Sequence, residues 1–166
     1  MTRKESPRSF VLSCFRGCSI VLLMMAVACA PAPATDKTPK AGGEMSRAVL
    51  DPYLKIQAAL ADDSMAGVKA NAGHVATAAT ALGAPAMTID TAAVQLAAAA
   101  EIGDARTRFG ALSEAIDTYM TGLKLKAPEG LKVAVCPMVH KPWLQAEADS
   151  RNPYFGKEML TCGSFR

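Results

Sequence analysis

Apolar side chains recur at alternating spacings of three and four residues through the middle of the chain. The clearest run has the apolar members Met65, Val68, Ala72, Val75, Ala79 and Leu82. A second run contains Ala105, Phe109, Leu112, Ile116, Tyr119 and Leu123. Residues at this spacing lie on one face of an α-helix. Each run therefore predicts a helix that buries one face against its neighbours.

Start signals predict two more helices. Asp51 and Pro52 supply a capping carboxylate and a proline suited to the first helical turn. The apolar face that follows them consists of Tyr53, Ile56 and Leu60. Asp90 can cap an alanine-rich helix that runs to about Ile102. Because short connections favour antiparallel neighbours, these helices predict an up-down four-helix bundle.

The period changes in the last part of the chain. Leu131, Val133 and Val135 alternate with polar or small residues, which predicts a short strand. We expect its partner strand near residues 158–161, with a loop containing Pro142 between the two. The predicted fold class is mainly α, an up-down four-helix bundle with a small C-terminal β-hairpin and loop extension.

Residues 1–28 have the pattern of an export signal. Basic side chains precede the apolar run Ser19–Ala28, which is too short to span a bilayer as a helix. The small residues before Cys29 resemble a bacterial lipobox, in which the cysteine is lipidated and becomes the new N-terminus. A plain signal peptide, cut after Ala28, Ala30 or Ala34, is the alternative.

Composition and charge divide the chain further. Residues 29–47 are rich in alanine, proline, glycine and lysine, which predicts a flexible tether and leaves residues 48–166 as the folded domain. The formal net charge of +3 resides in the leader, where basic side chains outnumber the single acidic residue, Glu5. No basic patch remains to attract nucleic acid. We therefore expect a periplasmic lipoprotein of the outer membrane, held at the membrane by its lipid alone.

Soft donor atoms gather in the tail of the chain. Cys136 and Met138 precede His140, and Met159 and Cys162 lie near the C-terminus. In an extended chain, residues two apart point to the same side, so the first three would form a row. If the ends of the tail pair, thiolate and thioether sulfur atoms meet, and this set suits Cu(I) better than zinc. His140 is a further candidate ligand for either metal.

A disulfide bond is the alternative to this metal site. Cys136 and Cys162 are the only cysteines of the predicted folded domain, and exported cysteine pairs often form a bridge. The chain-entropy model credits a loop of this length with roughly 3–4 kcal/mol. Met138 and Met159 would then fill the core. Spacing alone leaves both possibilities open; around a metal, Trp143 would shield the site from water.

Five segments carry a family resemblance. They are Tyr53–Asp63 (YLKIQAALADD), Phe109–Ile116 (FGALSEAI), Cys136–Met138 (CPM), Trp143-Leu144 (WL) and Asn152–Gly163 (NPYFGKEMLTCG). On these segments the chain, from near Leu50 to its end, resembles a domain of unknown function found in exported bacterial proteins. That domain is often attached to periplasmic adaptor subunits of heavy-metal RND efflux systems. The resemblance implies a helical domain associated with copper handling, with efflux-system or other envelope proteins as partners.

The remaining polar residues form no recognisable catalytic pattern. His74 lies beside the apolar face of its helix and is expected on the surface. Asp62 and Asp63 are expected at the start of that helix, where the helix dipole favours negative charge. No nucleophile with a supporting base is recognisable, so we do not expect an enzyme. The sequence predicts an envelope domain that binds a soft metal for copper buffering, transfer or resistance, or else a structural or interaction domain.

Overall fold

The computed structural model describes residues 39–166, which contain four α-helices and a three-stranded antiparallel sheet. The helices are α1 (Arg47–Ala61), α2 (Val68–Thr80), α3 (Met87–Ala97) and α4 (Ile102–Gly122). The strands are β1 (Lys132–Cys136), β2 (Lys141–Gln145) and β3 (Ser164–Phe165), and the short 3₁₀ helices are η1 (Ala84–Ala86) and η2 (Gly156–Glu158). The mainly helical fold class is confirmed to this extent. The predicted leader and the lipidation site at Cys29 lie outside the described residues.

The apolar faces predicted for α2 and α4 are confirmed. On α2 the buried residues include Val68, Ala72, Val75 and Ala79. On α4 they include Ala105, Phe109, Leu112, Ile116 and Tyr119. His74, on the opposite side of α2, is exposed as expected. These faces contribute to one hydrophobic core.

Helix α1 begins at Arg47, one turn before the predicted start at Asp51. Pro52 therefore lies inside the helix rather than in its first turn. The chain just before α1 is attached to the end of α4, because the Gly42 amide donates to the Leu123 carbonyl (3.0 Å). Met45 is also buried. This burial and pairing fix residues 42–46, the described end of the predicted tether, against the helices.

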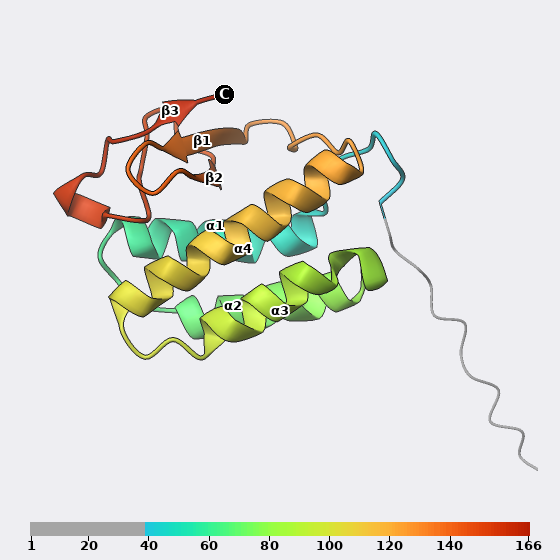
Figure 1. Ribbon diagram of the computed structural model, residues 1–166, viewed down its shortest axis with the longest axis horizontal. Helices are drawn as coiled ribbons and strands as arrows, with labels where there is room; N and C mark the ends of the chain where they lie inside the picture. Colours follow the sequence, from blue (N-terminus) through green and yellow to red (C-terminus); the bar gives the residue numbers. More distant parts are fainter. Residues whose placement is uncertain (1–38) are drawn as a thin grey trace, which may run out of the picture. The chain divides into compact units, whose positions relative to one another are not determined.

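The helices form two layers on one side of the sheet (Figure 1). The strands lie over α1 and α4, and α2 and α3 pack on the far side of that pair. Tyr53 of α1 contacts both α4 and the sheet: its ring stacks on Phe109 of α4 at a centroid distance of 5.0 Å. Its hydroxyl accepts the Leu144 amide of β2 (3.2 Å) and lies 2.8 Å from Ser113 Oγ. Burial raises the pKa of Tyr53 above its ordinary value of 10.0, so the hydroxyl stays protonated.

The sheet corrects the prediction for the tail. Its strand order is β2-β1-β3, with Ala134 opposite Trp143 in β2 and opposite Phe165 in β3. Strand β2 occupies a segment predicted as loop, whereas the segment near residues 158–161, expected to be the partner strand, contains the end of η2 and the bend and turn that follow it. Pro142 is tolerated because β2 is an edge strand, where a missing N–H need not break a ladder bond. Burial of Trp143 and Leu144 stabilises the strand despite its proline.

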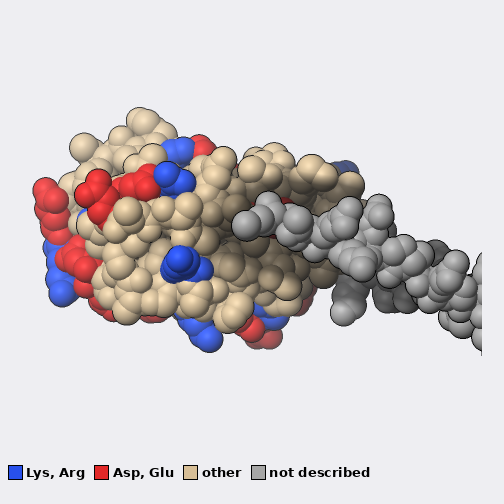
Figure 2. Space-filling view, turned by 90° about the horizontal axis from the view of Figure 1, so that it is seen from below, with Lys and Arg blue, Asp and Glu red and all other residues tan. Residues whose placement is uncertain are grey.

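Charged side chains of both signs are mixed on the surface. Seen from the side of α2 and α3, blue and red groups are interspersed on the face in view (Figure 2). Much of the surface between them is uncharged, and no single-sign patch appears on the part of this face that is in view. Within residues 39–166, none of the helices combines the length and hydrophobicity that crossing a bilayer requires.

Candidate functional site

The two tail cysteines are brought together by the sheet and by one asparagine. Cys136 ends β1 and is fully buried, and Cys162 lies half-buried just before β3. The side-chain amide of Asn152 donates to Cys136 Sγ (3.3 Å) and to the Cys162 carbonyl (2.7 Å). Both cysteines are free thiols in this structure. The two ends of the tail are therefore joined through Asn152, by the Cys136 thiol and the Cys162 backbone carbonyl.

Asn152 is the functional residue that the sequence interpretation missed. It is completely buried, and its Oδ1 accepts the Tyr154 amide (2.8 Å). The backbone N–H of Asn152 donates to the Leu160 carbonyl (2.7 Å), and the backbone carbonyl of Asn152 accepts the Gly156 amide (3.1 Å). These contacts fix which way the side-chain amide points. The available signal in the sequence was the position of Asn152 at the start of the NPYFG segment. A single asparagine in a loop does not predict a buried side chain.

The two methionines occupy different environments. Met159 is half-buried, and its carbonyl accepts the Cys162 amide (3.0 Å), so the two residues share one turn. Met138 is 60% exposed in the hairpin loop that joins β1 to β2. Met159 is thus close to Cys162, because both residues belong to the same turn. Met138 lies on the solvent side of the loop.

The prediction that Cys136, Met138 and His140 form a row is wrong. The strand ends at Cys136, and the His140 amide donates back to the Cys136 carbonyl (2.9 Å) to close the loop. His140 is exposed and has a φ of 55°, in the left-handed region. Pro137 starts this turn, so the chain does not stay extended beyond the buried thiol.

His140 lies beside acidic groups of α4. With Val135, Pro142 and other residues it lines a hollow of about 370 Å³ that also contains Glu114 and Asp117. Lys141 pairs with Glu114, and Arg166 pairs with Asp117. Val135 and Pro142 are opposite each other in the sheet, on the face away from Cys136, because successive side chains alternate.

Histidine, cysteine and carboxylate side chains do not form a metal site by themselves in the described part of the chain. Among residues 39–166, no group of three or more histidine, cysteine, aspartate or glutamate residues is arranged to hold a metal ion. A site at Cys136 and Cys162 must therefore draw on thioether sulfur. Thiol and thioether donors are soft, and this chemistry fits Cu(I) rather than zinc or a hard cation.

Trp143 packs on the same face of the sheet as Cys136. It is fully buried, and its Nε1 donates to Gln145 Oε1 (2.8 Å). Its ring packs edge-on against Tyr154 at a centroid distance of 5.9 Å. The ring also closes on the backbone next to Cys162, because a Cβ added at Gly163 would overlap Trp143 Cη2. The indole thereby lies against the chain directly after Cys162.

The acidic pair after α1 is another correction. Asp62 and Asp63 were expected to begin α2, but α1 ends at Ala61 and α2 begins only at Val68. At the C-terminal end of a helix the dipole disfavours negative charge, so these carboxylates need cationic partners. Arg106 pairs with Asp63 and Arg151 pairs with Asp62, each at 2.5 Å. The Arg151–Asp62 pair joins the end of α1 to the loop that carries Asn152, and the Arg106–Asp63 pair joins α4 to the end of α1.

Arg106 of α4 holds the loop that carries Asn152 through hydrogen bonds to backbone carbonyls. Its Nε donates to the Pro153 carbonyl (3.2 Å), and its Nη2 donates to the Leu60 carbonyl (3.1 Å). Asp63 Oδ2 accepts the Lys157 amide (3.3 Å). A Cβ added at Gly156 would overlap Asp63 Oδ1. The contact between Asp63, Arg106 and residues 153–157, here called the loop latch, therefore has no space for a side chain at Gly156.

The loop latch predicts a pH dependence. The hydrogen bond from Arg106 lowers the pKa of Asp63 below its ordinary value of 3.8. A lowered folded-state pKa means that the carboxylate adds to the free energy of unfolding above the unfolded pKa, and that this is lost as pH falls through the folded pKa. We expect Asp63→Asn to lower stability at neutral pH and to flatten its decline below about pH 5. Urea unfolding across this pH range measures both effects, and parallel curves for variant and wild type would contradict the assignment.

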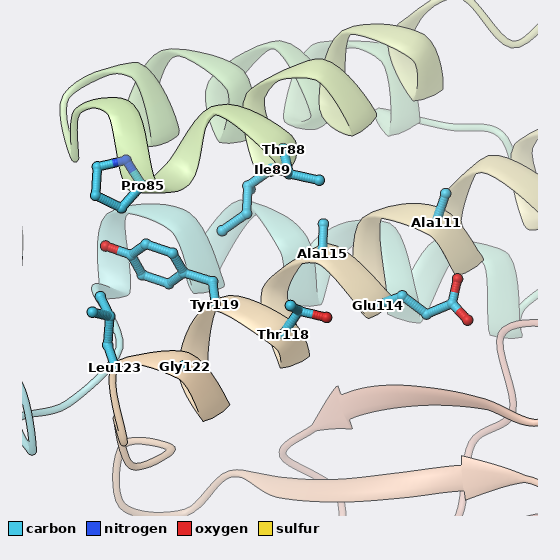
Figure 3. A pocket seen from close by; sticks show the side chains of 10 residues that line it. All are labelled: Pro85, Thr88, Ile89, Ala111, Glu114, Ala115, Thr118, Tyr119, Gly122 and Leu123. Atoms are coloured by element: carbon cyan, nitrogen blue, oxygen red, sulfur yellow. The ribbon is translucent and has the colours of Figure 1, made fainter.

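A larger hollow lies away from the cysteines, between α3 and α4. It measures about 580 Å³. Figure 3 shows Pro85, Tyr119 and Leu123 at one end of it and Ala111 and Glu114 at the other. Its lining has no thiol, thioether or imidazole group. It is therefore separate from the soft-donor chemistry of the tail.

Comparisons with protein families, with curated proteins and with solved structures found no match for this chain.

Proposed function

We propose that this domain binds a soft metal ion, Cu(I), in the bacterial envelope. One observation carries the proposal: the buried amide of Asn152 donates both to the free thiol of Cys136 and to the backbone carbonyl of Cys162, whose thiol is also free. Thiolate and thioether ligands together favour Cu(I), because zinc is bound by cysteine, histidine or carboxylate rather than by methionine. The role is buffering, transfer or resistance, because a sulfur site can pass Cu(I) between partners without redox turnover.

The proposed ligands have unequal roles. Cys136, Cys162 and Met159 form the inner set, since Met159 and Cys162 share one turn. Met138 is the outer donor, supplied from the exposed hairpin loop. His140 stays outside the set, because it lines the hollow on the other face of the sheet. A buried thiol with an exposed donor nearby suits a site that must exchange its metal.

The surrounding features of the proposal rest on the sequence. Residues 1–28 direct export, and Cys29 carries the lipid that anchors the protein in the outer membrane. The four helices form an up-down bundle that supports the tail. Efflux-system or other envelope proteins exchange copper with the domain, in line with its family resemblance. The domain acts as a binding protein rather than an enzyme and does not bind nucleic acid.

Replacing the tail methionines tests the ligand set. Methionine and leucine have similar volumes, so we expect Met159→Leu and Met138→Leu each to cost less than about 1.5 kcal/mol of stability. We expect the Cu(I) affinity to fall by more than about tenfold in Met159→Leu, and less in Met138→Leu, because a thioether donor is lost. Anaerobic competition with a chromophoric Cu(I) chelator measures the affinity.

Met87→Leu is the matched control, because Met87 is 64% exposed on α3 and lies outside the tail. Its Cu(I) affinity should equal that of the wild type. An unchanged affinity in a Met138→Leu, Met159→Leu double variant would remove the thioethers from the proposed site.

The same proximity supports a second function, a structural or interaction domain with a Cys136–Cys162 disulfide. Strands β1 and β3 pair with Val135 opposite Ser164, so Cys136 follows this pair by one residue and Cys162 precedes it by two. Counting free thiols in protein isolated from an oxidising compartment separates the two functions. A bridge that persists, with no copper uptake after mild reduction, supports the structural function. Reducible thiols that then take up copper support the metal site.

A further inference from the structure

Asn152 is the buried polar side chain that contacts both cysteine residues. We propose that it is a positioning residue, whose amide sets Cys162 against Cys136 and stabilises charge on the Cys136 sulfur. The copper part of this inference rests on the proposed function. The positioning of the two cysteine residues does not, because it follows from hydrogen bonds of Asn152 to the Cys136 thiol and the Cys162 backbone carbonyl.

Both protons of the Asn152 amide are committed to the cysteine residues. One points at Cys136 Sγ and the other at the Cys162 carbonyl. Oδ1 is held by the Tyr154 amide, so the group cannot turn over without losing all three bonds. A rigid donor at this place connects the end of β1 to the turn before β3. The distance between the cysteines is thereby set by a third residue rather than by the thiols themselves.

The hydrogen bond to sulfur gives Asn152 a chemical as well as a geometric role. Metal binding and thiol–disulfide exchange both proceed through thiolate sulfur. An N–H donor strengthens its bond as the sulfur gains negative charge. Outer residues that donate to metal ligands typically change metal affinity by about 10–100-fold when they are replaced.

Asn152 is held in place from the side away from the cysteines. Its neighbour Pro153 accepts a hydrogen bond from Arg106 of α4, and Lys157 donates to Asp63 beyond the end of α1. The loop latch therefore fixes the start and end of the segment that begins at Asn152. The amide keeps its position because the helices hold it, whether or not the sulfur atoms bind a ligand.

Asn152→Asp tests the role with little change of shape. The carboxylate keeps the acceptor for the Tyr154 amide, but it cannot donate to sulfur or to the Cys162 carbonyl. Asn71→Asp is the matched chemical control, because Asn71 donates only to the Gly67 carbonyl beside α2. Val75→Ala controls for stability alone, because Val75 is fully buried on α2, away from the tail.

Two equilibria are measured on each protein: Cu(I) affinity, and the exchange with glutathione. In the exchange, one oxidised glutathione takes two electrons and two protons from the two thiols and leaves as two reduced molecules. An S–S bond forms between Cys136 and Cys162. The glutathione equilibrium needs no metal, so it reports on the thiol pair even if the wild type does not bind copper.

We expect Asn152→Asp to shift the glutathione equilibrium toward the dithiol, because the chain at Cys162 is no longer held beside Cys136. We expect it to lower Cu(I) affinity by about 10–100-fold. Asn71→Asp and Val75→Ala should leave both constants unchanged. An unchanged glutathione equilibrium in Asn152→Asp, or an equal shift in Val75→Ala, overturns the inference. If the wild type takes up no copper but the glutathione shift appears, the positioning role stands and the proposed function fails.

Discussion

Replacing both tail cysteines with serine is expected to lower Cu(I) affinity by on the order of a thousandfold or more. Serine oxygen is a hard donor that Cu(I) does not favour, and only the thioethers of Met138 and Met159 would remain. The fold should survive, because the hydroxyl introduced by Cys136→Ser can still accept the amide of Asn152, which now donates to Cys136 Sγ. Anaerobic competition with a chromophoric chelator measures the loss.

The single variants make this test specific. Cys162→Ser changes a half-buried residue and should preserve the unfolding transition. It should still lose most of the affinity, because the remaining thiol has no partner. Circular dichroism confirms that each variant is folded before titration. A double variant that binds Cu(I) within about tenfold of the wild type, a difference near 1.4 kcal/mol, would show that the cysteines are not the ligands.

Truncation of Trp143 is expected to produce the largest loss of stability. The indole is fully buried between β2 and the backbone at Gly163, and its Nε1 donates to Gln145. We expect Trp143→Ala to lower the free energy of unfolding by about 3–5 kcal/mol, because a large cavity opens in the core. Urea unfolding of the metal-free protein measures this change.

A second variant keeps the Trp143 prediction testable if the alanine variant does not fold. Trp143→Phe retains an aromatic ring but leaves out the donor to Gln145, so it should lose less stability than alanine. Val94→Ala is the exposed control, since Val94 is 56% exposed on α3. Surface changes of this kind usually stay within about 0.5 kcal/mol. A loss below about 1 kcal/mol in Trp143→Ala would contradict the packing described.

The helical part of the fold was predictable because its signal is local. The spacing of Val68, Ala72, Val75 and Ala79 survives in the core unchanged. The start of α1 was not predictable from its own residues. It depends on contacts of Met45 and of the end of α4, which lie outside α1. Pro52 also suggested a first turn, although packing tolerates it inside the helix.

The tail was predictable only in part, because tertiary contacts decide its conformation. The motifs around Cys136 and Cys162 were enough to expect that the two ends of the tail pair, and β1 does pair with β3 just after Cys162. Strand β2 was not expected, because Pro142 weakens the local strand signal and only the burial of Trp143 and Leu144 compensates. The direction of Met138 was missed because the hairpin turn begins directly after the buried thiol.

The partners of Asp62 and Asp63 lie beyond any local pattern. Helix-dipole reasoning placed these residues at the start of a helix, which is the usual position for acidic pairs. Arg106 and Arg151 are distant in sequence, and only the folded chain brings their guanidinium groups to the carboxylates. Asn152 was missed for the same reason, since its role depends on residues from both ends of the tail.

X-ray absorption spectroscopy of the reduced protein, loaded anaerobically with Cu(I), tests the proposed copper site most directly. We predict a single bound copper ion per chain, with sulfur neighbours from Cys136, Cys162 and Met159, and no copper retained by the double serine variant. A wild-type protein that retains no Cu(I), or a copper spectrum with only nitrogen and oxygen neighbours, would contradict the proposal.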